Sequence, residues 1–342
     1  MTFKIAAYGV RENEIAYFNK LNRYDYELTL LADNLTHDNV ETAKGHDAVL
    51  IRANNVADAQ NLATLAEYGI KYVFTRTVAY SHIDLAAAKA NGQTVAYVPS
   101  YSPYAVGELA FTLALMQQRH TTMAAANAAK GQFQVLPGMF ATELHDLTVG
   151  IIGTGRIGRA EAELWRGVGA TVLGYDVYEN DDAKTWLTYA TEEELLAKSD
   201  IVSLHVPHFP GKNDAYFNAD YVAKMKDGAI LVNTARAEIT DQDAILDAVE
   251  SGKLNGFATD VVSQERLFFG KDFKGESTGN ATVDKMMALY PQVIVAPHMG
   301  SYTEEALTDM ISISFDNFND VLTTGTSRCG VVFYFLFVLI IV

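Results

Sequence analysis

Short apolar runs alternate with amphipathic stretches along most of the chain, and this alternation predicts strands and helices in turn. In the C-terminal two thirds, six nearly continuous apolar runs are expected to be strands covered on both faces: 148–152, 170–175, 201–206, 229–232, 256–262 and 293–296. Four stretches with helical spacing lie among them: 159–167, 192–197, 219–225 and 241–251. Thr191 followed by Glu194 has capping-box form and marks one helix start. This order predicts a doubly wound parallel sheet.

The first hundred residues repeat the same pattern in shorter units. Strands are expected at 4–8, 48–51, 72–76 and 94–97, and helices at 12–22 and 57–68. Pro99 and Pro103 then interrupt the chain, and an Ala-rich helix is predicted over 105–130, closed by Gly131. The predicted fold class is therefore α/β, with two Rossmann-like, doubly wound parallel-sheet domains and a cleft between them.

Charge and cysteine content exclude several classes of partner. The formal net charge is −16, with only 26 Lys and Arg residues and no basic run. Polyanions would be repelled, so we expect neither a nucleic-acid partner nor a membrane-surface role. Cys329 is the only cysteine, which excludes an internal disulfide or a Cys-based metal site, and no metal site is predicted. The N-terminus lacks the layout of a signal peptide, so a cytoplasmic location is expected.

The end of the chain has a different character. Residues 331–342 are twelve apolar residues without a charge, whereas a membrane-spanning helix needs roughly 20. We interpret this segment as an atypical apolar tail, either a sequence artefact or a stretch buried on a neighbouring surface. A short membrane anchor is the alternative.

A glycine-rich turn follows the strand expected at 148–152 and opens a helix. Gly153, Gly155 and Gly158 have the spacing that allows a tight turn, close backbone approach to a pyrophosphate and close helix–strand packing. Exposed N–H groups at the helix start would receive the phosphate charge. Asp176 lies 18 residues after Gly158, at the end of the next strand, where a carboxylate binds a ribose 2′-hydroxyl and repels a 2′-phosphate. The pattern predicts NAD rather than NADP; a glycine turn without a ligand is the alternative.

Three polar residues follow three later strands. Arg236, Glu265 and His298 lie beyond the carboxyl ends of their strands, where open α/β sheets bind ligands. An arginine offers a fork of donors for a carboxylate and a carbonyl oxygen. A carboxylate beside a histidine stabilises the imidazolium, which suits a proton donor near neutral pH. The alternative is an ordinary salt bridge and a structural histidine.

These motifs occur together in one order: 152–158, Leu204-His-Val-Pro207, Asn233-Thr-Ala-Arg236, the stretch from Asp260 to Glu265, and Pro297-His298. In that combination the chain resembles the D-2-hydroxyacid dehydrogenase family, which includes D-lactate, D-2-hydroxyisocaproate and (R)-2-hydroxyglutarate dehydrogenases. The resemblance covers about residues 4–325. It implies that Arg236 binds the carboxylate and carbonyl of a 2-keto acid, that His298 paired with Glu265 delivers the proton, and that NADH supplies the hydride to C2.

The resemblance also implies a cofactor site and a domain plan. The positions matching the family's NAD site are Gly153, Gly155, Arg156, Ile157, Gly158, Asp176, Val206, Pro207, Asn213, Thr234, Ala235 and Asp260. Residues 102–298 are expected to form the NAD-binding Rossmann domain. Residues 1–101 with 299–330 are expected to form a discontinuous, flavodoxin-like substrate domain. A homodimer through the 105–130 region is implied.

The substrate domain is expected to bind the side chain of the acid. Backbone N–H groups of Val78 and Ala79 are candidates to hold the substrate carboxylate, although relatives usually have Gly at position 79. Tyr101 matches a substrate-side tyrosine of the lactate-type branch. Arg52 follows a strand and is a candidate for the distal carboxylate of a dicarboxylic acid, as in the 2-hydroxyglutarate branch, or else a surface arginine. Pyruvate, 2-oxoglutarate and a bulky acid such as phenylpyruvate or 2-oxoisocaproate remain open as substrates.

Two other interpretations of the function of this fold stay open. A formate dehydrogenase would have Gln beside the histidine, and Glu265 argues against it, with Gln264 next to it. An NAD-sensing co-repressor would use the fold as a binding module. His205 is expected near the nicotinamide, with no chemistry assigned to it. The other six histidines are interpreted as surface or packing residues: His37, His46, His82, His120, His145 and His208.

Overall fold

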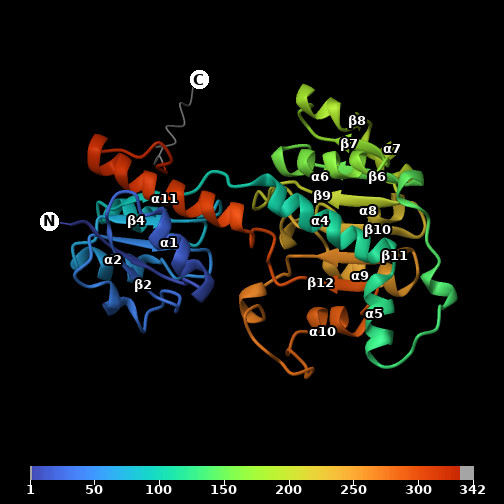
Figure 1. Cartoon of the computed structure of the whole chain (residues 1–342), viewed down its shortest axis with the longest axis horizontal. Helices are drawn as coiled ribbons and strands as arrows, with labels where there is room; N and C mark the ends of the chain where they lie inside the picture. Colours follow the sequence, from blue (N-terminus) through green and yellow to red (C-terminus); the bar gives the residue numbers. More distant parts are fainter. Residues whose placement is uncertain (1, 332–342) are drawn as a thin grey trace, which may run out of the picture. The chain divides into compact units, whose positions relative to one another are not determined.

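The computed structural model describes residues 2–331, so the predicted apolar tail lies outside the described residues except for Val331. The chain divides into two compact units (Figure 1). One holds residues up to Ser102 and from Thr303 onward, and the other is Pro103–Tyr302. The two boundaries between the units thus lie one and four residues later in the sequence than expected. The second crossing comes later because Thr303 is the N-cap of the long helix α11, which belongs to the first unit.

The first unit is a five-stranded sheet in the order β2-β1-β3-β4-β5. Its strands, all parallel, are β1 (Lys4–Ala7), β2 (Glu27–Leu30), β3 (Ala48–Ile51), β4 (Tyr72–Thr75) and β5 (Thr94–Ala96). Its helices are α1 (Ile15–Leu21), α2 (Ala59–Glu67), α3 (Leu85–Ala90) and α11 (Glu304–Thr324), with 3-10 turns η1 (Glu12–Glu14) and η2 (Val40–Ala43). This strand order is the one found in flavodoxin-like sheets.

Side chains of these strands alternate between two apolar layers. Ile5 and Ala7 pack with α1 and α11, whereas Ala6 and Tyr8 pack with α2 and α3. Both faces are covered, which explains why β3 reads as an uninterrupted apolar run. β2 was not predicted, because this edge strand is only partly buried and carries the polar residues Glu27 and Thr29.

The second unit is a seven-stranded parallel sheet in the order β12-β11-β10-β9-β6-β7-β8. Its strands are β6 (Thr148–Ile152), β7 (Thr171–Tyr175), β8 (Thr188–Tyr189), β9 (Ile201–Leu204), β10 (Ala229–Asn233), β11 (Leu254–Thr259) and β12 (Val293–Val295). The strand order reverses between β6 and β9, and this switch point is where doubly wound sheets bind ligands.

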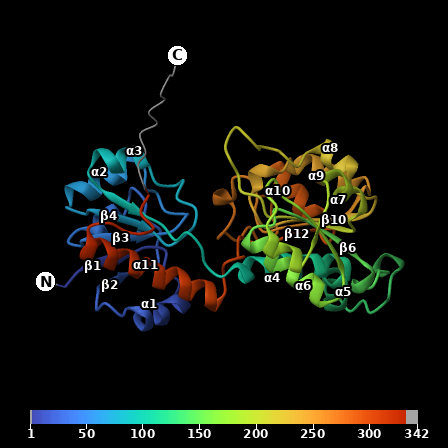
Figure 2. The same ribbon diagram turned by 90° about the horizontal axis from the view of Figure 1, so that it is seen from above.

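Helices cover both faces of this sheet, as Figure 2 shows. One layer contains α4 (Pro103–Gln118) and α6 (Arg156–Gly167), and the other contains α7 (Glu192–Lys198), α8 (Ala219–Lys224), α9 (Gln242–Glu250) and α10 (Ala281–Ala288). The 3-10 turns are η3 (Pro137–Met139), η4 (Leu144–Asp146), η5 (Asp181–Thr185), η6 (Ala237–Ile239) and η7 (Glu265–Leu267). The Thr191 side chain accepts from the Glu194 N–H, so the predicted helix start is confirmed.

Two sequence predictions need correction. The single helix expected over 105–130 is two helices, because His120 adopts a left-handed backbone (φ 51°) between α4 and α5 (Thr121–Ala129). The strand expected at 256–262 ends at Thr259, whose hydroxyl bonds both backbone groups of Val261 and turns the chain. Among residues 2–331 no helix is long and apolar enough to cross a membrane.

Candidate active site

The glycine turn lies between β6 and α6, at the switch point of the sheet. Gly153 has φ 93°, and a Cβ there would come within 2.7 Å of the backbone carbon of His205. A Cβ on Gly158 would come within 2.1 Å of the Gly153 carbonyl oxygen. A Cβ on Gly155, by contrast, would meet no atom within 4 Å. Two glycines are therefore required by packing, and the third leaves an open surface at the helix start, which fits a pyrophosphate.

Asp176 follows β7 and is tied to this turn. Its Oδ2 accepts hydrogen bonds from the Thr154 N–H at 2.7 Å and the Thr154 hydroxyl at 3.3 Å. Thr154 is in turn held by the Tyr189 hydroxyl, 2.7 Å from its Oγ1. The sequence predicted Asp176 as part of this site but did not indicate its contact with Thr154 or the contact of Thr154 with Tyr189. A carboxylate oxygen has more than one lone pair, so Asp176 retains capacity for a ribose hydroxyl.

Two further loops border the switch point. Asn213 bonds within its own loop, donating to the Pro207 carbonyl at 2.8 Å and accepting from the Phe209 N–H at 2.7 Å, and so shapes the segment that follows Val206. After β10, the Thr234 hydroxyl is buried and has no hydrogen-bond partner among the described residues. An orphaned buried hydroxyl at this edge fits a polar group supplied by a ligand.

The three predicted catalytic residues come together in the second unit. His298 Nδ1 lies 2.6 Å from Glu265 Oε1. Arg236, at the start of η6, donates from Nη1 to the Ala235 carbonyl at 2.6 Å, and its charge is close enough to lower the pKa of His298. The sequence-predicted pair is therefore formed, with the arginine beside it. The side chain of His298 is 45% exposed, so a small molecule can approach the ring.

The net pKa of the His298 imidazole is raised above its ordinary value. The largest influence, desolvation by neighbouring atoms, lowers this pKa, as does the charge of Arg236. The hydrogen bond and charge of Glu265, together with the charge of Asp260, raise it by more. The arrangement therefore favours the protonated ring, as a proton donor near neutral pH requires.

Asp260 supports the histidine through the backbone. Its two carboxylate oxygens accept the N–H groups of Met299 and Gly300, each at 2.8 Å. His298 itself has a left-handed backbone (φ 54°), which is uncommon for a residue with a side chain. Asp260 was predicted to line the cofactor site; the bonds to Met299 and Gly300 were not foreseen. Burial raises the pKa of this carboxyl group, and the two backbone N–H groups lower it.

The predicted substrate residues follow strands of the first unit. Arg52 comes directly after β3 and donates from Nη1 to the Gly9 carbonyl at 3.4 Å. Val78 and Ala79 lie in the loop after β4, where the Thr77 hydroxyl donates to the Ala79 carbonyl. Ala79 is not among the residues with positive φ, so glycine is not needed at this position. Tyr101 is partly exposed, beyond β5.

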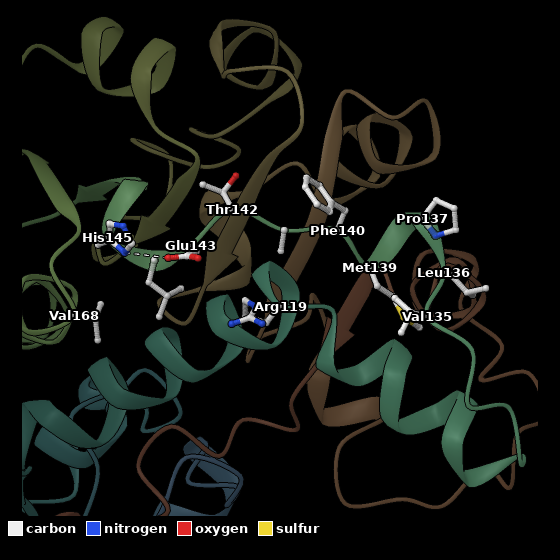
Figure 3. A pocket seen from close by; sticks show the side chains of 12 residues that line it. Arg119, Val135, Leu136, Pro137, Met139, Phe140, Thr142, Glu143, His145 and Val168 are labelled. Atoms are coloured by element: carbon white, nitrogen blue, oxygen red, sulfur yellow. Dashed lines mark ion pairs between the residues drawn. The ribbon is translucent and has the colours of Figure 1, made fainter.

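A cavity of about 760 Å³ lies elsewhere in the second unit. Figure 3 shows Arg119, Phe140 and His145 around it, with an ion pair between His145 and Glu143. His145 precedes β6 and Val168 follows α6, so the cavity is at the amino end of β6, whereas the glycine turn is at its carboxyl end. This cavity is not the catalytic site.

Comparisons with known proteins agree with this geometry. Residues 111–300 match the family described as "D-isomer specific 2-hydroxyacid dehydrogenase, NAD binding domain". The chain is 37% identical to a D-lactate dehydrogenase of Lactiplantibacillus plantarum, covering 96% of this chain and 99% of the relative. It is 35% identical to an aromatic 2-oxoacid reductase of Clostridium sporogenes, covering 95% and 98%. A D-lactate dehydrogenase of Lactobacillus jensenii solved with NAD+ superposes with a TM-score of 0.83 at 33% identity, covering 96% and 100%.

The fold, the glycine turn and the His298–Glu265 pair thus define a nicotinamide-dependent dehydrogenase. The chain belongs to the D-isomer specific 2-hydroxyacid dehydrogenase family, and it is an NAD-dependent oxidoreductase. The predictions of family, fold class, enzyme class and cofactor are confirmed.

Proposed function

We propose that Arg236, Glu265 and His298 carry out the reduction of a 2-keto acid to its D-2-hydroxy acid. The observation that supports this most directly is the 2.6 Å contact between His298 Nδ1 and Glu265 Oε1, beside Arg236 and beyond the ends of three sheet strands. NAD in its reduced form supplies the hydride that adds to C2. The protein's own residues must bind the acid and deliver one proton.

Each of the three residues has one role. The Arg236 guanidinium binds the carboxylate and carbonyl oxygen of the acid through its parallel N–H groups. His298 uses Nδ1 for Glu265, so Nε2 is the nitrogen that donates a proton to the oxygen forming on C2. Glu265 keeps the ring protonated until then, which follows from its effect on the pKa of His298.

The cofactor is held by backbone and side-chain groups around the switch point. We assign the pyrophosphate to the N–H groups from Gly155 to Gly158, including those of Arg156 and Ile157. Asp176 binds the adenosine ribose. The loop of Val206, Pro207 and Asn213, the turn of Thr234 and Ala235, and Asp260 border the nicotinamide side. The open surface at Gly155 and the orphaned Thr234 hydroxyl support this assignment.

Pyruvate is the proposed substrate, with D-lactate as product, because the chain is 37% identical over 335 residues to a protein named D-lactate dehydrogenase. An aromatic 2-keto acid is the second candidate, because a relative named aromatic 2-oxoacid reductase is nearly as similar. We assign the substrate role to the first unit, with Val78, Ala79 and Tyr101 as contacts. Arg52 remains the candidate for a distal carboxylate, although part of its guanidinium is occupied by the Gly9 carbonyl.

Initial rates of NADH oxidation with pyruvate, phenylpyruvate and 2-oxoglutarate test the assignment. The proposal expects the highest kcat/KM with pyruvate, and a higher value with phenylpyruvate would favour the second candidate. For 2-oxoglutarate, the variant to compare with wild type is Arg52→Ala. If it leaves the KM for 2-oxoglutarate unchanged, Arg52 does not bind a distal carboxylate. No turnover with any of the three acids contradicts the proposed function.

We further propose a cytoplasmic homodimer. Helix α5 has no buried residue, and the segment after it exposes Phe133, Val135 and Phe140, of which the last two are 91% and 92% exposed. Large exposed apolar side chains in one segment are typical of an interaction surface. Light scattering after gel filtration should give twice the chain mass, and Val135→Asp with Phe140→Asp should give the monomer. A wild-type monomer would contradict this proposal.

A further inference from the structure

A buried carboxylate–imidazole pair lies behind the glycine turn and has no part in the chemistry described above. Glu161 Oε2 lies 2.5 Å from His205 Nε2, and the two side chains are 0% and 2% exposed. Glu161 belongs to α6, and His205 is the first residue after β9. A carboxylate this deep is costly unless its oxygens are bonded, so the pair constrains both elements.

The pair is built into a small polar cluster. The other Glu161 oxygen, Oε1, accepts from the indole Nε1 of Trp165 at 3.0 Å, one turn further along α6. Ser203 Oγ lies 3.2 Å from His205 Nε2. Both carboxylate oxygens are thus engaged, and the Nε2 proton of His205 points to helix α6. The ring orientation of His205 is therefore fixed by Glu161.

The backbone of His205 forms one wall of the phosphate turn. Its N–H donates to the Ile152 carbonyl at 2.8 Å, and its own carbonyl group is what a Cβ on Gly153 would strike. Glu161 is three residues beyond Gly158, the last glycine of the turn. The Glu161–His205 contact consequently connects the two elements on either side of the turn, the end of β9 and the first turns of α6.

We propose that Glu161 is a positioning residue for NAD binding: through His205 it holds the end of β9 against α6, and this keeps the glycine turn in the form that receives the pyrophosphate. Glu161 has no exposed surface, so it does not contact the cofactor itself. The inference concerns cofactor affinity alone and does not depend on which keto acid is reduced.

Three variants in α6 test the proposal through the Kd of NADH, measured by fluorescence titration without keto acid. Glu161→Met keeps the volume of the side chain but cannot accept a hydrogen bond from His205. It should raise this Kd about three- to thirtyfold. Glu161→Gln retains an acceptor oxygen and should stay close to wild type. Trp165→Phe is the matched control: it removes the other bond to Glu161 and some packing but leaves the His205 contact, and should also bind NADH like wild type.

The comparison separates positioning from loss of stability. A merely structural role would lower the folded fraction and leave the Kd of the folded protein unchanged. A folded Glu161→Met protein with the wild-type Kd would overturn the proposal, as would equal weakening by Glu161→Met and Trp165→Phe.

The wild-type enzyme gives an independent test if Glu161→Met does not fold. In protein labelled with 15N-histidine, the Nε2–H resonance of His205 is identified by its absence from His205→Gln. This resonance should shift when NADH is added, since the ring is joined to the wall of the phosphate turn. A resonance that NADH leaves unchanged would overturn the proposal.

Discussion

The carboxylate of Asp260 holds the chain that follows His298, with Oδ1 on the Met299 N–H and Oδ2 on the Gly300 N–H, each at 2.8 Å. His298 itself has φ 54°, and Gln264, directly before Glu265, has φ 59°. One member of the proposed catalytic pair, His298, and the residue directly before the other, Gln264, therefore have backbone conformations that are costly for residues with side chains and must be held by their surroundings.

Asp260→Asn should disturb this arrangement. An asparagine offers one oxygen and places its NH2 group against a backbone N–H, so one hydrogen bond is lost and two donors face each other. We expect a loss of about 1–3 kcal/mol in the free energy of unfolding. We also expect a fall in kcat of up to about a hundredfold, because the ring of His298 is displaced.

Asp284→Asn is the control for Asp260→Asn. Asp284 lies in α10 and also accepts a backbone N–H, that of Thr278 in the segment before the helix. It should lose some stability and keep kcat. Urea unfolding and steady-state kinetics on both variants measure the difference, and equal effects on kcat would contradict the role assigned to Asp260.

The pH dependence of reduction should report the Glu265–His298 pair. Reduction needs the protonated imidazole, so kcat/KM for the keto acid falls as pH rises through the pKa of His298. Glu265 raises this pKa through its hydrogen bond and charge. Glu265→Gln removes the charge, so the fall should begin at lower pH than in wild type. A pH–rate profile that keeps its alkaline limb in place would show that Glu265 does not control the proton donor.

The glycine turn offers a matched pair of alanine variants. A methyl group on Gly158 would meet the Gly153 carbonyl oxygen at 2.1 Å, so Gly158→Ala should cost about 1–3 kcal/mol of stability and weaken NADH binding. A methyl group on Gly155 would meet no protein atom, so Gly155→Ala should melt like wild type and still bind NADH more weakly. Thermal unfolding and NADH titration check both. Unchanged NADH affinity in Gly155→Ala would place the pyrophosphate elsewhere.

Asp176 should set the choice between the two nicotinamide cofactors. Its charge would repel a 2′-phosphate, and its oxygens would accept a hydrogen bond from a ribose hydroxyl. Asp176→Ser should lower the ratio of kcat/KM for NADH to that for NADPH by about tenfold or more. Thr154→Val is the control, because it removes a hydroxyl bonded to Asp176 and leaves the carboxylate in place. A ratio that falls equally in both variants would mean that loop geometry, and not charge, controls the choice.

The sequence predicted what depends on local pattern. β6 and the glycine turn follow from an apolar run and glycine spacing, and Thr191 from a capping box. The helix break at His120 was missed because nothing in an Ala-rich stretch indicates a left-handed residue. Glu161 could not be assigned either, since its partner His205 lies 44 residues away on another element. Contacts of that kind are set by packing of α6 on the sheet.

His298 is the proposed proton donor of a 2-keto acid reductase. The most direct measurement compares kcat/KM for pyruvate reduction and the Kd of NADH in wild type and His298→Ala. D-lactate is the expected wild-type product. His298→Ala should lose about a hundred- to ten-thousandfold in kcat/KM, with the Kd of NADH retained. A His298→Ala enzyme that reduces pyruvate at the wild-type rate would contradict this role.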